Sequence, residues 1–224
     1  MRQRDLIPFF AMAFLISWGI LALYIFVPAP MGRWFGNLTG EHPLFYLAVY
    51  APAIAAVLLV LYRHGIDGTR RFLARLLLWR ASIYWYVFLI VGVPLVFYAA
   101  ALFKDGAYGT LFPFASVPAY LLALFLMTIK GPVEEIGWRG MALPLMQRSM
   151  SPFWAGLVLG IIWGIWHLPA FLLSGTPQSA WSLTPFFVGT IALSVIVTPL
   201  FNSARGSILL LSLIHISEPT RPTT

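Results

Sequence analysis

Long apolar runs dominate this sequence, and short polar stretches separate them. The runs cover residues 6–27, 43–62, 82–103, 112–130, 154–173 and 183–201, and a further one begins near residue 206. A helix needs about 20 mostly apolar residues to cross the hydrocarbon core of a bilayer. The pattern therefore predicts an all-α fold, a polytopic transmembrane helical bundle of about six to seven spans whose last span is truncated.

The composition supports a membrane protein rather than a soluble domain. Hydrophobic residues make up 60% of the chain and charged residues only 9%, and the mean hydropathy is +0.87. Soluble domains carry about 25% charged residues. The first apolar run is too long for the core of a signal peptide, and no small-residue cleavage site follows it. We expect this run to be retained as the first span.

The absence of cysteine narrows the possible chemistry. It excludes disulfides, lipid attachment to cysteine, iron–sulfur clusters and thiolate nucleophiles or metal ligands. Any catalysis must use oxygen and nitrogen groups.

The formal net charge of +7 follows membrane topology rather than nucleic-acid binding. If the spans simply alternate, only Arg33 and Lys104 among the basic residues up to Arg205 lie opposite the others. Cytoplasmic loops of membrane proteins carry an excess of Lys and Arg. We therefore expect a multi-pass protein of the bacterial plasma membrane with a cytoplasmic N-terminus. Its partner is the lipid bilayer, and no nucleic acid is expected.

A cytoplasmic amphipathic segment is expected near residues 68–80. Arg71 and Arg75 are four residues apart, with Phe72 and Leu73 between them. This spacing is typical of a helix that lies in the headgroup region.

The densest group of charges in an apolar context is at residues 131–140, which include Glu134, Glu135 and Arg139. Ionisable residues at membrane depth are rare and mark functional sites. In a helix, Glu135 and Arg139 share one face at i and i+4 and can pair, whereas Glu134 points about 100° away and stays free. A carboxylate that faces an apolar cavity can take up a proton near neutral pH, as a general base must. We expect Glu134 to be the base and Glu135 its structural neighbour.

The next apolar run, residues 154–173, has His167 as its one ionisable group. His167 can polarise or orient a water, and Trp163, one turn earlier, can form an apolar wall of a substrate pocket. Gly156, Gly160 and Gly164 recur every four residues on the same run, a pattern that lets membrane helices approach closely. We expect this packing to bring His167 near Glu134.

These residues resemble the CAAX-protease and bacteriocin-processing family of intramembrane proteases, also called Abi. Residues 133–144 read Val-Glu-Glu-Ile-Gly-Trp-Arg-Gly-Met-Ala-Leu-Pro, and residues 161–169 read Ile-Ile-Trp-Gly-Ile-Trp-His-Leu-Pro. The family is marked by Glu-Glu-x-x-x-Arg, by aromatic-x-x-x-His on the next helix, and by His-x-x-x-Asn/Asp near the C-terminus. Glu134, Glu135 and Arg139 match the first motif. Trp163 and His167 match the second, with Trp where Phe is more usual.

The resemblance implies a membrane endopeptidase that acts on a peptide or protein substrate with glutamate-activated water. Members have long been labelled metalloproteases, so a divalent metal such as zinc is a possible cofactor, with Glu134 and His167 as candidate ligands. Catalytic zinc usually has three protein ligands and a water. The resemblance also implies a third-motif His and Asn that stabilise the oxyanion.

The third motif departs from the family pattern. His215 falls at the expected distance after Ser207 and is the sequence's candidate for the catalytic His, but Pro219 stands where Asn or Asp is expected. Residues 211–221 also resemble the translation of a sequencing-library adapter. We therefore divide the chain into N-terminal membrane helices with the amphipathic segment (1–110), a protease core (111–210) and an artefactual tail (211–224).

Two other functions remain open at this stage. The chain can be a non-catalytic membrane scaffold or bacteriocin-immunity protein in which Glu135 and Arg139 form only a structural pair. It can also be a small transporter, because intramembrane carboxylates and histidines line proton paths, although no inverted repeat supports this.

Overall fold

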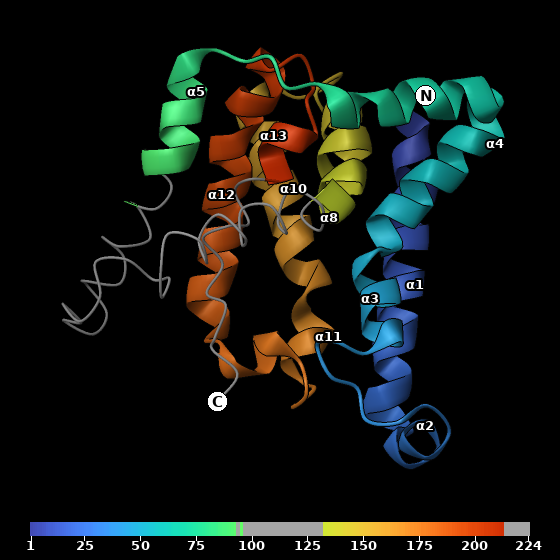
Figure 1. Ribbon diagram of the computed structural model, residues 1–224. Helices are drawn as coiled ribbons and strands as arrows, with labels where there is room; N and C mark the ends of the chain where they lie inside the picture. Colours follow the sequence, from blue (N-terminus) through green and yellow to red (C-terminus); the bar gives the residue numbers. More distant parts are fainter. Residues whose placement is uncertain (93–94, 96–131, 213–224) are drawn as a thin grey trace. The chain divides into compact units, whose positions relative to one another are not determined.

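The structure is a computed structural model that describes residues 1–92, 95 and 132–212 (Figure 1). Its described part consists of helices joined by turns, with no strand, and the predicted all-α class is confirmed. The predicted run at 112–130 and residues 93–94 and 96–103 of the run at 82–103 lie outside the described residues. The same holds for residues 213–224 of the tail.

The chain divides into two compact units, and each is described by itself. The first unit comprises Met1–Ala74 and Val133–Pro199, and the second comprises Arg75–Pro132 and Leu200–Thr224. The helix α12 (Leu183–Ser203) begins in the first and ends in the second. The other helical elements of the first unit are η1 (Gln3–Asp5), α1 (Leu6–Phe26), α2 (Pro28–Phe35), α3 (Pro43–Val49), α4 (Ala51–Leu73), α8 (Pro132–Gly137), η4 (Trp138–Ala142), α9 (Leu143–Met146), α10 (Pro152–Trp166), α11 (Leu168–Phe171) and η5 (Pro177–Ala180).

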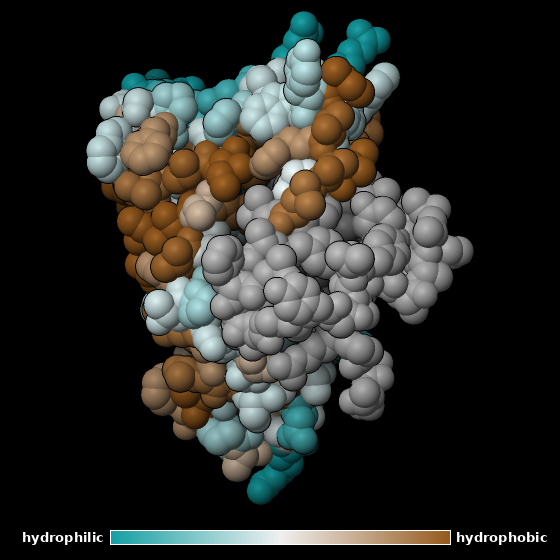
Figure 2. Space-filling view, turned by 90° about the vertical axis from the view of Figure 1, so that its left-hand side faces the viewer, coloured by the Kyte–Doolittle hydropathy of each residue, from teal (hydrophilic) through white to brown (hydrophobic). Residues whose placement is uncertain are grey.

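Within the described residues, three helical stretches are long and apolar enough to cross a bilayer, namely Gln3–Phe26, Pro152–Phe171 and Leu183–Ser203. They coincide with the first, fifth and sixth predicted runs. The second run is bent by 58° between α3 and α4, and counts as a fourth span if the bent pair crosses as one. Brown, apolar side chains cover much of the coloured surface in Figure 2. Such a surface suits contact with lipid rather than water.

The bend has a local cause that the sequence carries. Pro52 stands in the first turn of α4, where its missing N–H is tolerated, and it cannot donate a hydrogen bond to the carbonyl of Ala48 one turn earlier in α3. A second break lies at Gly65, whose φ of 63° is left-handed. The helical stretch after Gly65 holds Arg70 and Arg71 and continues through η2 (Ala74–Leu77). The predicted segment at 68–80 is therefore helical only as far as Leu77.

The glycines of α10 allow a close helix approach, as their spacing predicted, but the helix that they contact is α12 and not the one that carries Glu134. A Cβ on Gly156 would lie 2.7 Å from the Thr198 hydroxyl, and a Cβ on Gly160 would lie 2.8 Å from the Cα of Ile191. A Cβ on Gly164 would lie 2.7 Å from the ring of Phe187. Only glycine allows this close approach. The position of the C-terminal end of α10 is consequently fixed against α12.

A second close approach positions α8. A Cβ on Gly137 would lie 2.5 Å from the carbonyl oxygen of Pro52, so α8 packs directly against the backbone of α4. The adjacent Trp138 is fully buried and makes edge contacts with Phe9 of α1 and Trp166 of α10. The acidic segment is thus held between the first span and α10.

The second unit contains α5 (Ile83–Val87), the π-helix η3 (Phe88–Gly92), the end of α12 and α13 (Leu209–Ser212). Two of its segments are joined by hydrogen bonds. The amide of Ile208 donates to the carbonyl of Arg75 at 3.3 Å, and the Ser207 hydroxyl donates to the carbonyl of Leu78. Arg75 Nε donates to the carbonyl of Gly206 at 3.1 Å. These contacts fix residues 75–78 against the turn that follows α12.

Candidate active site

The predicted pair of Glu135 and Arg139 is present and completely buried. Arg139 Nη1 lies 2.9 Å from Glu135 Oε1, and neither side chain is exposed. The pair joins the last turn of α8 to η4, a π-helical turn. Arg139 also stacks on the ring of Trp163, with its Cζ 4.2 Å from the ring centroid. A buried guanidinium needs such partners, because an unpaired buried charge is strongly destabilising.

Glu134 does not stay free as the sequence analysis expected. The indole Nε1 of Trp163 donates a hydrogen bond of 2.8 Å to Glu134 Oε2. Trp163, which the sequence suggested as an apolar wall, has this further role as a hydrogen-bond donor to Glu134. A hydrogen bond to a charged acceptor is about twice as strong as a neutral one. Trp163 therefore orients the carboxylate while its ring face contacts Arg139.

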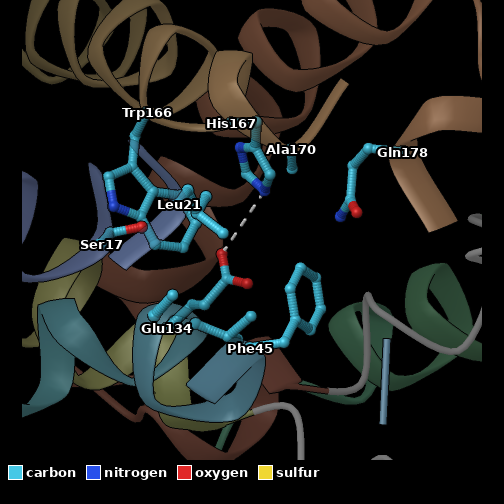
Figure 3. Close-up of a pocket in the computed structure, with 10 residues that line it drawn as sticks. Ser17, Leu21, Phe45, Glu134, Trp166, His167, Ala170 and Gln178 are labelled. Atoms are coloured by element: carbon cyan, nitrogen blue, oxygen red, sulfur yellow. Dashed lines mark ion pairs between the residues drawn. The ribbon is translucent and has the colours of Figure 1, made fainter. Parts of the chain in front are cut away.

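His167 presents one defined nitrogen to the carboxylate. Its Nδ1 lies 2.8 Å from the carbonyl oxygen of Trp163. A carbonyl can only accept, so Nδ1 carries the proton and Nε2 is the nitrogen that faces Glu134. His167 Nε2 lies 4.0 Å from Glu134 Oε2. The predicted proximity of the two residues is thus present in the structure, and Figure 3 shows their side chains pointing toward each other.

Aromatic rings surround the imidazole of His167. The ring centroids of Trp166 and Phe186 lie 4.8 Å and 4.9 Å from it, and the centroid of Trp163 lies at 5.8 Å. Phe186 comes from α12, so the α10–α12 contact also shapes the site. These rings pack around the imidazole, whose Nε2 faces Glu134.

A small cavity lies beside the carboxylate and the imidazole (Figure 3). The volume open to the centre of a water-sized sphere is about 20 Å³, and a water needs about 10–15 Å³ of such volume. The cavity accordingly has room for one water. Its walls come from five helices and one 3₁₀ turn: Ser17, Leu21, Phe45, Ala48, Val49, Glu134, Trp166, His167, Ala170 and Gln178.

Sequence reasoning did not find Gln178, Ser17 or Phe45 as part of this site. Gln178 extends toward the cavity from η5, opposite Glu134, and its buried Oε1 has no hydrogen-bond partner among the described residues. An unpartnered buried amide oxygen is uncommon in native structures and calls for an explanation. The signal available in the sequence was weak, since one glutamine in a polar loop resembles ordinary surface.

The donors at the site do not by themselves form a zinc centre. No group of three His, Cys, Asp or Glu side chains suited to a metal occurs in the part of the chain that the structure describes. Glu134 and His167 provide two donors, one fewer than catalytic zinc usually takes from protein. His215, the remaining sequence candidate, lies outside the described residues.

The fold and the site define a helical membrane protein with a partly buried glutamate and a buried histidine beside a water-sized cavity. Residues 116–218 match the family described as type II CAAX prenyl endopeptidase Rce1-like. Over 102 residues the chain is 31% identical to the CAAX prenyl protease 2 of Methanococcus maripaludis, a match that covers 43% of this chain and 38% of that relative. Both matches support the resemblance to the CAAX-protease family, and the residues of the family match include Glu134, Arg139 and His167.

Proposed function

We propose that the protein is an intramembrane endopeptidase in which Glu134 and His167 activate a water for attack on a peptide bond. The observation that carries this proposal is the 4.0 Å separation of Glu134 Oε2 and His167 Nε2 beside a cavity that has room for one water. A water can donate its two hydrogens to these two acceptors at ordinary distances. Its lone pairs then point away from both, toward a substrate carbonyl.

The reaction proceeds by general base catalysis. The water oxygen forms a bond to the carbonyl carbon of the substrate while one of its protons passes to Glu134, and the carbonyl oxygen becomes negative. The carbon–nitrogen bond then breaks, and the proton held by Glu134 passes to the leaving amine. His167 holds the water in line through Nε2, because Nδ1 is fixed on the carbonyl of Trp163.

Gln178 is our candidate for stabilising the negative oxygen. Its amide lies on the cavity wall opposite Glu134, and a side-chain N–H in this position can donate to an oxyanion. The family pattern places a third-motif His and Asn in that role, and His215 lies outside the described residues. Gln178 offers a donor that the described part of the chain supplies itself.

We propose that the peptide bond is cut close to the membrane. The candidate spans and the apolar surface support an integral membrane location, and the distribution of arginines supports a cytoplasmic N-terminus in a bacterial plasma membrane. The relative's name, CAAX prenyl protease 2, makes prenylated C-terminal peptides the first substrates to test. Because the match spans 38% of that relative, unmodified membrane peptides belong in the same screen.

The deciding experiment measures cleavage of quenched peptides, prenylated and unprenylated, by the purified full chain in proteoliposomes. Glu134→Gln should reduce cleavage to background, whereas Glu41→Gln, which alters an exposed glutamate in a turn, should leave it unchanged. Equal cleavage by wild type and Glu134→Gln, or none by either with every peptide, would overturn the proposal. The non-catalytic scaffold would then be the better description, and Glu134→Gln should preserve its cellular phenotype.

A further inference from the structure

The second unit contains a cavity that the proposed reaction does not use. It lies between the segment after η2 and the turn after α12, and the volume open to the centre of a water-sized sphere is about 130 Å³. One water needs about 10–15 Å³ of such volume, so this cavity accepts a polyatomic group. Its lining consists of Leu77, Leu78, Trp79, Arg80, Ala204 and Arg205.

The charge around this cavity has a single sign. The described residues of the second unit include Arg75, Arg80 and Arg205 and no Asp or Glu. Arg75 is committed to the fold, because its Nε donates to the Gly206 carbonyl and its guanidinium stacks on Phe201 at 5.3 Å. Arg80 and Arg205 are exposed and line the cavity. Two arginines on one cavity, with no acid among the described residues of the second unit, favour an anionic ligand.

The backbone at Arg205 gives a second, independent indication. Its φ of 55° is left-handed, and it is the one residue other than glycine with positive φ in the described part of the chain. Glycine or asparagine adopts this conformation more readily than arginine. Strained residues of this kind cluster at ligand sites. The guanidinium is therefore held at the cavity by a backbone conformation that arginine does not prefer.

The position of Arg205 just after the end of α12 indicates where the cavity lies in the membrane. The helix has 21 residues and is about 32 Å long, which matches a hydrocarbon core of about 30 Å. Arg205 follows its last residue by two positions and so lies at the level of the lipid headgroups. Beside these arginines, Leu77 and Trp79 are 77% and 62% exposed. Exposed tryptophans are typical of the membrane interface, and an exposed leucine there can contact acyl chains.

We propose that this cavity binds the phosphate group of an anionic phospholipid, with Arg80 and Arg205 on the phosphate and Leu77 and Trp79 against the upper acyl chain. Free phosphate offers the same anion but no apolar part. The exposed apolar side chains therefore favour the lipid as its source. The inference does not depend on the proposed protease activity, since none of these residues lies in the candidate active site.

The test titrates the detergent-purified full chain with phosphatidylglycerol, phosphatidylcholine or inorganic phosphate and counts bound molecules by native mass spectrometry. Wild type should bind phosphatidylglycerol in preference to the other two. Each arginine near a membrane surface contributes about a fivefold increase in affinity. Arg80→Gln with Arg205→Asn should thus weaken phosphatidylglycerol binding on the order of 30-fold, by the same reasoning.

The variants are chosen so that a failure to fold does not decide the outcome. Asparagine tolerates the left-handed backbone at position 205, and Arg80→Gln alone leaves the turn after α12 intact and should weaken binding about fivefold. Arg70→Gln, an exposed arginine outside the cavity, should bind as wild type does. Equal binding by the double variant and wild type, or binding of inorganic phosphate as tight as that of phosphatidylglycerol, would overturn the proposal.

Discussion

Trp163 donates its indole N–H to Oε2 of Glu134 at 2.8 Å, and the guanidinium Cζ of Arg139 lies 4.2 Å from the centroid of the same indole ring. One side chain therefore connects the buried ion pair of Glu135 and Arg139 to the proposed base. The family pattern asks only for an aromatic residue at this position, and phenylalanine has no N–H to donate. The tryptophan gives this chain a means of orienting Glu134 that phenylalanine cannot supply.

Trp163→Phe should lower kcat and leave KM nearly unchanged. The variant keeps an aromatic ring over Arg139 and removes only the hydrogen bond to the carboxylate, which is worth about 1.5–3 kcal/mol for a charged partner. A loss in kcat of about 10- to 100-fold is expected from that range. Steady-state kinetics in proteoliposomes measures it, and a wild-type kcat would show that the hydrogen bond has no catalytic role.

Gln178→Leu should reduce kcat by about 100-fold if the amide stabilises the negative oxygen, since removal of one such donor costs 10²–10³ in other hydrolases. Gln178→Glu keeps the shape and removes the N–H donor, so it should be equally impaired. The exposed neighbour Ser179→Ala serves as the control. A Gln178→Glu enzyme with normal kcat would exclude the amide as a donor.

Glu135→Leu should destabilise the protein by about 3–5 kcal/mol, because it leaves a buried guanidinium without its carboxylate. Glu135→Leu with Arg139→Met should recover much of this loss, since an apolar pair of similar volume is often neutral. Activity should remain low in the double variant, because the stacking on Trp163 is gone. Chemical denaturation in detergent and the cleavage assay separate the two effects. A double variant as unstable as the single one would contradict the explanation.

The sequence predicted the parts of the site that depend on spacing within one helix. The pair of Glu135 and Arg139 followed from an i, i+4 relationship, and the close packing of α10 followed from glycines at every fourth position, although its partner α12 did not. The sequence could not predict the hydrogen bond from Trp163 to Glu134. Its direction depends on how α8 lies against α10, and α8 is in turn held against α4 by the packing of Gly137 on Pro52, a contact between distant parts of the chain.

Other features were missed for different physical reasons. Gln178 reaches the cavity from a short 3₁₀ turn, and an isolated polar residue in a loop has no periodicity to reveal it. Pro52 was a sequence indication of the bend between α3 and α4. It was missed because the run is continuously apolar and reads as one span. The predicted span at 112–130 and the third-motif candidate His215 lie outside the described residues, so they stay predictions.

Gly160→Ala and Gly189→Ala should have opposite consequences for stability. A Cβ at Gly160 meets the Cα of Ile191 at 2.8 Å, and overpacking of this kind costs about 1–3 kcal/mol. A Cβ at Gly189 meets nothing within 4 Å, and alanine is favoured over glycine in a helix by about 1 kcal/mol. Unfolding midpoints of the two variants compare them directly. Equal midpoints would mean that α10 and α12 have room to separate.

Chelation should leave cleavage intact if Glu134 and His167 activate water as proposed. The described residues provide two of the three protein ligands that catalytic zinc usually takes. Activity should be compared before and after treatment with 1,10-phenanthroline, with its non-chelating isomer as the control. Loss of activity that zinc restores would contradict this prediction and would place a third ligand outside the described residues, where His215 is found.

The glycine contacts between α10 and α12 also limit how the site can open. His167 ends the helix that is locked to α12, and Phe186 of α12 lies against its ring. The histidine side of the site is consequently held in place by α12. Because α8 is itself held against α4 by the contact of Gly137 with Pro52, we expect a peptide to enter by displacement of the turn that carries Gln178. The amide of Gln178 then returns to the cavity only after the peptide has entered.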